Sequence, residues 1–139
     1  MTAPARNKSS SVPVKTVALA ASLGVAGVLA VYFFARLAGT DFTVASPPAV
    51  TSPLPWWLFV SYAAGAGAAM FLVIPLAEKF ARPRLIAYVT VALGLAAMTP
   101  APFLVSSDFL TIFWLTASHV ALVAPLFALS RRLPQRKAE

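Results

Sequence analysis

The chain has 139 residues, of which 60% are hydrophobic and 11% charged, and its mean hydropathy is +0.82. Soluble domains contain about 25% charged residues, so a water-soluble fold of this length is excluded and a single membrane domain is expected. A net charge of +7 would suit nucleic-acid binding. However, every Lys and Arg except Arg36 flanks an apolar run, and if successive runs cross the membrane in alternating directions, all of these residues lie on the same side of it. This is the positive-inside pattern of membrane proteins.

The chain starts with a polar, basic segment, residues 1–15, which we interpret as a cytoplasmic tail. The first apolar run covers about 16–37 and is long enough to span the membrane, because about 20 apolar residues are needed. A cleaved signal peptide is the alternative, but its apolar region would have about 7–15 residues. We therefore interpret this run as a retained anchor.

An external loop is predicted for residues 39–55, which contain no Lys or Arg. Its prolines and β-branched residues favour extended backbone. The second span, about 56–77, then opens with Trp56 and Trp57, which suit the head-group level.

Small residues recur at helical spacing along the second span. Such positions let helices approach closely in lipid, so this helix is predicted to be the central, most contacted one. Alanine-rich genome composition is the alternative explanation. The residues expected to pack against neighbouring helices are Ser61, Gly65, Gly67 and Ala69.

A short basic turn, residues 78–84, leads into the third span, about 85–105. Pro100 and Pro102 lie inside this span and lack a backbone N–H, so regular helix is expected to end near Thr99.

Asp108 follows two serines and is predicted to cap the fourth span, 109–130. Residues 131–139 form a second basic cytoplasmic tail. The predicted fold is therefore an all-α, membrane-spanning four-helix bundle over residues 16–130. Four spans with this alternation of charge place both termini in the cytoplasm.

His119 is the one ionisable residue expected near mid-membrane. It lies ten positions after the cap, or about 15 Å along a helix, and ionisable residues at that depth suggest function. Proton or substrate chemistry is one possibility. A metal or haem ligand is another, although a second His and any Cys are missing, and only Met70 or Met98 could pair with it on haem. The third is a neutral imidazole that hydrogen-bonds across helices to one of four residues: Ser118, Thr116, Thr90 or Tyr62.

Arg36 near the outer end of the first span is a further candidate polar site. It is most simply an interfacial arginine that extends to phosphate, with Asp41 starting a turn. The alternative is a pair between Arg36 and Asp108 across helices.

No set of residues that would catalyse a reaction is apparent. The sequence offers no carboxylate pair within a span, no nucleophile with an evident base and no cysteine. We therefore predict neither an enzyme nor a metal or cofactor site.

Several short motifs occur together along the chain: Asp-Phe-Thr-Val at 41–44, Leu-Ala-Glu-Lys-Phe at 76–80 before Arg-Pro-Arg at 82–84, Thr90 with a downstream Pro100, and a lone His119 before a terminal Arg pair. In these features, over residues 16–132, the chain resembles a family of small bacterial four-helix membrane proteins classed as a domain of unknown function. The resemblance implies a four-helix fold in the cytoplasmic membrane and no particular activity.

The expected function is that of an accessory, assembly or self-associating subunit of the cytoplasmic (inner) membrane. Its expected partners are the lipid bilayer, other membrane-protein subunits or copies of itself, with anionic lipid head groups at the basic ends and no nucleic acid. A small transporter or proton-linked permease that uses His119 is the alternative.

Overall fold

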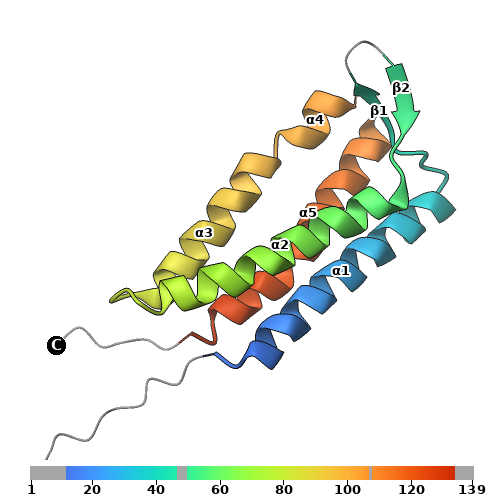
Figure 1. Ribbon diagram of the computed structural model, residues 1–139. Helices are drawn as coiled ribbons and strands as arrows, with labels where there is room; N and C mark the ends of the chain where they lie inside the picture. The colour runs from blue at the N-terminus through green and yellow to red at the C-terminus, as the bar shows by residue number, and fades with distance from the viewer. Residues whose placement is uncertain (1–11, 47–49, 107, 134–139) are drawn as a thin grey trace, which may run out of the picture.

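The computed structural model describes residues 12–46, 50–106 and 108–133. Five helices and a two-stranded hairpin make up this part of the chain (Figure 1). In chain order they are α1 (Val14–Leu37), β1 (Thr43–Ser46), β2 (Val50–Pro53), α2 (Trp56–Ala77), α3 (Pro83–Met98), α4 (Ala101–Val105) and α5 (Phe109–Ser130).

Four helical segments are long and apolar enough to cross a membrane, with α3 and α4 together forming the third. The 24 residues of α1 extend about 36 Å, which exceeds the roughly 30 Å of a bilayer's hydrocarbon core. The prediction of an all-α fold with four helices of membrane-spanning length and hydropathy is confirmed, as a multi-pass membrane protein requires.

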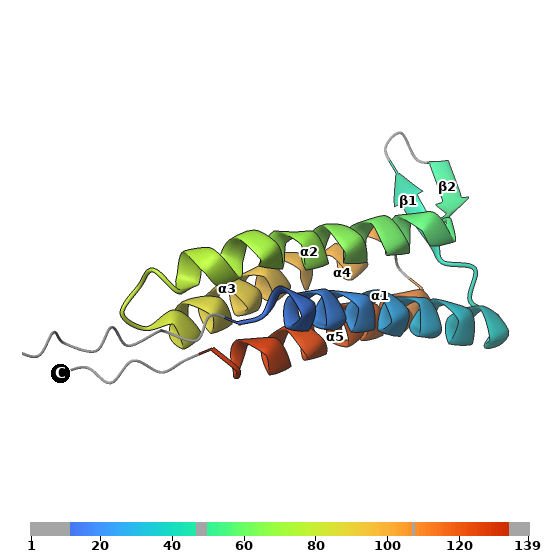
Figure 2. The same ribbon diagram turned by 60° about the horizontal axis from the view of Figure 1, so that its bottom comes forward.

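The helices pack as a three-helix core with α3 on one side. α1 lies along both α2 and α5 (Figure 2). The backbones of α2 and α5 come close at few positions, but side chains of both helices belong to the same hydrophobic clusters. α3 makes fewer contacts than α1 with either helix. Small residues allow these close approaches: a Cβ on Gly24 would stand 3.1 Å from the Leu122 side chain of α5, and one on Gly67 would stand 2.8 Å from Ala21 of α1. The prediction that the second span is the most contacted helix is wrong, because α1 is. Of the two glycines of α2, Gly67 meets another helix closely and Gly65 does not.

The connection between α1 and α2 forms a hairpin in which β1 and β2 pair antiparallel, Thr43 opposite Pro53. Extended backbone was expected here, but the pairing was not. Phe42 precedes the hairpin in the left-handed region (φ 50°) and is fully buried. Its ring stacks on Tyr32 of α1 and packs edge-on against Phe59 of α2, with centroids 5.4 and 5.0 Å apart. Phe42, rather than the hairpin itself, therefore packs between these two helices.

The third span is interrupted where the prolines predicted it. α3 ends at Met98 and α4 begins at Ala101, since Pro100 and Pro102 cannot donate the hydrogen bonds of a continuous helix. The hydroxyl of Thr99 donates to the carbonyl of Leu95 at 2.8 Å.

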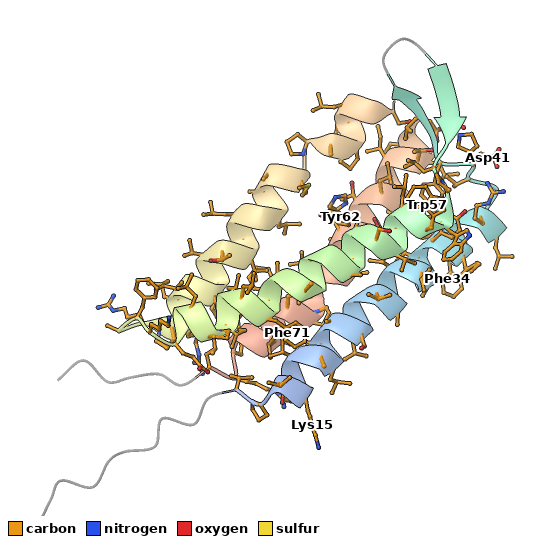
Figure 3. All side chains as sticks on the ribbon, viewed as in Figure 1. Lys15, Phe34, Asp41, Trp57, Tyr62 and Phe71 are labelled. Atoms are coloured by element: carbon orange, nitrogen blue, oxygen red, sulfur yellow. The ribbon has the colours of Figure 1, made fainter. Side chains whose placement is uncertain are left out.

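Charge separates the two ends of the molecule. Figure 3 shows Lys15 at one end and Asp41 and Trp57 at the other. At the Lys15 end, called here the basic end, Nη2 of Arg84 donates to the carbonyls of Arg131 (2.5 Å) and Leu133 (3.3 Å), and Nε of Arg131 donates to the hydroxyl of Tyr88 (3.0 Å). These bonds fasten the start of α3 to the end of α5.

Candidate functional site

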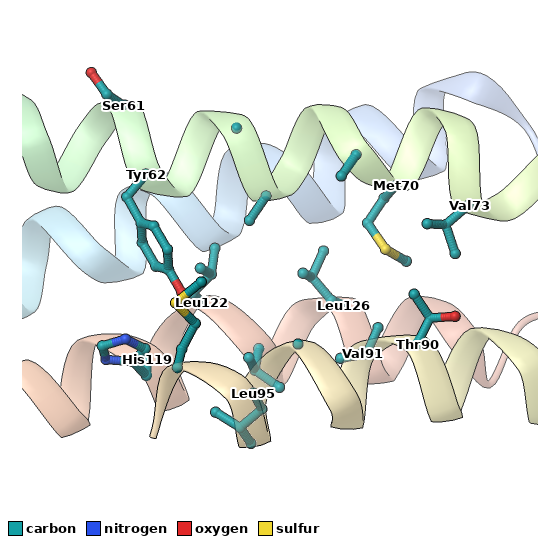
Figure 4. Close-up of a pocket in the computed structure, with 16 residues that line it drawn as sticks. Ser61, Tyr62, Met70, Val73, Thr90, Val91, Leu95, His119, Leu122 and Leu126 are labelled. Carbon is teal, nitrogen blue, oxygen red and sulfur yellow. The ribbon is translucent and has the colours of Figure 1, made fainter. Parts of the chain in front are cut away.

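A cleft of about 440 Å³ lies between α2, α3 and α5 (Figure 4). This is within the roughly 300–1,000 Å³ of small-molecule sites. Its walls are mainly aliphatic, and four of its side chains carry polar atoms: Ser61, Tyr62, Thr90 and His119. The hydroxyl of Thr90 donates to the carbonyl of Ile86 in its own helix at 2.9 Å, so the polar groups that remain lie toward the Tyr62 and His119 end.

The cleft exists because small residues line two of its walls. On α2, Gly65 and Ala69 face it, and on α3, Gly94 does. A Cβ added to Gly65 or Gly94 would meet no atom within 4 Å. The three residues are also exposed, so the cleft is open along its α2–α3 side.

This placement corrects part of the helix-packing prediction. Gly67 does pack, against Ala21 of α1. Ser61, Gly65 and Ala69 line the cleft instead, because they form a row on a different side of α2 from Gly67, and α3 stands too far away to fill the space.

His119 is held by its own helix. Its Nδ1 lies 2.6 Å from the carbonyl oxygen of Leu115, and because a carbonyl oxygen only accepts, Nδ1 carries a proton. In the neutral ring, Nε2 is then an acceptor, and it has no protein partner among the residues that the structure describes. The expected hydrogen bond across helices is therefore wrong for this part of the chain. The contact across the cleft is instead between rings, with the Tyr62 and His119 centroids 5.5 Å apart.

Three cavities meet at His119. Besides the cleft, it lines a hollow of about 260 Å³ toward the hairpin end, together with Tyr62, Met98 and Leu54. It also lines a hollow of about 120 Å³ that includes Thr99. Because Tyr62, Met98 and His119 border both larger cavities, they form a neck between the outer hollow and the cleft.

The other two candidate residues, Arg36 and Asp108, have separate local roles. Nη1 of Arg36 lies 2.6 Å from Oδ1 of Asp41, so the alternative pairing of Arg36 with Asp108 is wrong. Asp108 caps α5 as predicted, with Oδ2 accepting from the amide of Thr111 at 2.7 Å. Hydrogen bonds from the hydroxyl and then the amide of Thr111 hold the pKa of Asp108 below its ordinary value.

Sequence reasoning missed the α3 wall of the cleft. Thr90, Gly94 and Met98 recur every four residues and so lie on one face of a helix. That row was the available signal, but an isolated glycine in an apolar span does not by itself indicate a cavity. Among the described residues, no group of three or more His, Cys, Asp or Glu lies together as a metal site would require.

Comparison with known proteins gives no relatives. No protein-family model matches the chain, and no curated protein or solved structure matches it either. The family resemblance noted in the sequence therefore stays a prediction.

Proposed function

We propose that this protein is a non-enzymatic, multi-pass subunit of the cytoplasmic membrane that assembles with other membrane-protein subunits or with copies of itself. The observation that carries the proposal is a shallow groove between α1 and α2, called here the α1–α2 groove. Five of its eight residues are Ala or Ser: Ala21, Ser22, Ala26, Ala64 and Ala68, with Val25, Leu29 and Phe71 completing it.

The α1–α2 groove differs from the lipid-facing surface beside it. Leu19 and Leu23 of α1 are 60% and 55% exposed and present bulky side chains of the usual lipid-facing kind. Ser22 and Ala26, on the neighbouring row, are exposed and small. Because helix association in lipid depends on close packing, an exposed row of small residues on two adjacent helices suits the docking of a further transmembrane helix.

Because the chain has no cysteine of its own, single cysteines can be introduced to test this proposal by disulfide cross-linking. Ala26→Cys lies in the groove, and Leu23→Cys on the same helix serves as its matched control. If copies of the chain associate through the groove, oxidation in native membranes should give a disulfide-linked dimer for Ala26→Cys and little for Leu23→Cys. Equal cross-linking of both variants would contradict a defined self-interface.

Recovery in mild detergent tests the same groove for other partners. The tagged wild-type chain is expected to recover a stable complex larger than one copy, and Ala68→Leu, which fills the groove, is expected to lose it without losing stability. Recovery of monomer alone from wild type, together with no cross-linking, would refute the proposal.

The proposed orientation places both termini in the cytoplasm. Described Lys and Arg residues other than Arg36 belong to the basic end, as the positive-inside rule requires of a cytoplasmic face, where they would also meet anionic head groups. Reporter fusions at Arg82 and Glu139 should read internal and a fusion at Ala49 external. An external signal at Glu139 would contradict this topology.

A second candidate function is a small transporter or proton-linked permease. It is favoured by the interruption of the third span at Thr99, beside the His119 neck, because broken helices in transporters border substrate sites near mid-membrane. A His119→Ala variant that keeps its stability and its assembly but loses ion or substrate flux would favour transport over the accessory role.

A further inference from the structure

The cleft between α2, α3 and α5 has a different character from the α1–α2 groove. Polar side chains line one end of the cleft, where Tyr62 and His119 face each other. Aliphatic side chains line the other end, around Val73 and Leu126. Figure 4 shows Tyr62 extending from α2 toward the α5 and α3 side, with His119 nearby on α5. The cleft therefore matches an elongated apolar molecule with one polar end.

The hydrogen-bonding state of His119 defines that polar end. Nδ1 is occupied by the Leu115 carbonyl, which leaves Nε2, the ring nitrogen farther from the helix, as an acceptor in the neutral imidazole. Nearby, the Tyr62 hydroxyl can both donate and accept. A ligand hydroxyl can donate to Nε2 and accept from Tyr62, whereas an ether or an acyl chain cannot donate.

The location of the cleft restricts the ligand further. Charged groups near mid-membrane are costly. Among the described residues no Lys or Arg lines the cleft, so an anionic head group would meet no counter-charge from this part of the chain. Gly65, Ala69 and Gly94 leave the cleft open on its α2–α3 side. A neutral molecule dissolved in the bilayer could therefore enter laterally.

We propose that the cleft binds a neutral, lipid-soluble molecule with a hydroxyl group, a phenol or an alcohol, whose hydroxyl donates to Nε2 of His119 beside Tyr62. This site is separate from the α1–α2 groove and does not depend on the proposed assembly. Ordinary phospholipid acyl chains are the alternative occupants, and they would fill the cleft without the polar contact.

Because His119 is the only histidine in the chain, its ring nitrogens can be observed directly. Protein labelled with ring-¹⁵N histidine, purified through a histidine-free tag into lipid nanodiscs, would be titrated with 4-nonylphenol. The matched control ligand is 4-nonylanisole, its methyl ether, which has nearly the same apolar surface but no donor. We expect a saturable upfield shift of the Nε2 signal with the phenol alone and about tenfold tighter binding of the phenol, the ratio expected for one hydrogen bond.

Two variants of α2 locate the site. Gly65→Leu places a side chain in the cleft and is expected to abolish the saturable shift, while Ala68→Leu, on the α1–α2 groove, is expected to leave it unchanged. Equal shifts with phenol and ether, no shift with either, or full retention of the shift in Gly65→Leu would each overturn the proposal.

A third variant tests the hydrogen bond without the histidine signal. His119→Phe keeps a ring of similar size, so it should still bind 4-nonylanisole in equilibrium dialysis against protein-free nanodiscs. It should lose the roughly tenfold preference for the phenol. If that preference persists, the hydroxyl is recognised by another group and the assignment to Nε2 is wrong.

Discussion

Gly67 of α2 lies against Ala21 of α1 so closely that a Cβ on Gly67 would stand 2.8 Å from the Cβ of Ala21 and 3.4 Å from its Cα. Both atoms belong to Ala21 and are held by the backbone of α1, so neither can move aside as the end of a long side chain could. The approach of α1 and α2 is set at this point.

Gly67→Ala should lower the free energy of unfolding by about 1–3 kcal/mol, the usual cost of overpacking. Gly65→Ala is its control on the same helix, because its Cβ would meet no atom within 4 Å, and it should leave stability unchanged or slightly raised. Reversible unfolding in mixed micelles would compare the two. Equal destabilisation by both variants would contradict the packing described for α2.

Asp108→Ala should destabilise the start of α5, because the amide of Thr111 would lose its acceptor. Asp108→Asn should retain much of the cap. Since the pKa of Asp108 is lowered in the folded protein, its charge adds stability that is fully present above the ordinary aspartate pKa and is lost as the pH falls through the folded value. The advantage of wild type over Asp108→Asn should therefore be constant near neutral pH and shrink in acid, as melting temperatures across that range would reveal.

Arg84→Gln should loosen the attachment of α3 to α5, because the carbonyls of Arg131 and Leu133 would lose their donor. The free energy of unfolding is expected to fall by about 1 kcal/mol, and backbone amides in the first turns of α3 are expected to exchange faster. Arg82→Gln is the matched control, since Arg82 is exposed and its side chain makes no hydrogen bond or ion pair with the described part of the chain. An identical exchange pattern in both variants would show that Arg84 does not fasten the helices.

Arg36→Gln should lower the free energy of unfolding by less than about 1 kcal/mol, because the ion pair of Arg36 with Asp41 is exposed to solvent. The two side chains are 45% and 74% exposed, respectively. The effect should decrease as salt is added. Asp41→Asn and the double variant complete a cycle that isolates the pair. A loss of several kcal/mol that does not respond to salt would mean that Arg36 has a buried partner.

The spans could be predicted from the sequence because each depends on properties of a single segment. Length and hydropathy defined the helices, the prolines at 100 and 102 marked the break, and Asp108 was recognised by its position before an apolar run. These features are local, so no knowledge of neighbouring helices was needed.

The cleft could not be predicted in the same way, because it depends on which rows of side chains face each other. Gly65 and Gly67 are two residues apart and look alike in the sequence, yet one borders an open space and the other meets Ala21. Likewise, the imidazole of His119 was expected to bond across helices, but the carbonyl one turn back at Leu115 is nearer. The burial of Phe42 between Tyr32 and Phe59 also needs the two helices side by side.

Because α3 is attached less closely than the other long helices, the width of the cleft is easier to change than the spacing of α1 from α2 or α5. α1 packs closely along both α2 and α5, whereas α3 makes fewer contacts, is joined to α5 by Arg84 at the basic end and is interrupted by Pro100 near the other end. A tilt of α3 about its fastened end would change the girth of the cleft while the three-helix core kept its packing. The cleft could then accept bound molecules of different thickness with little strain in the protein.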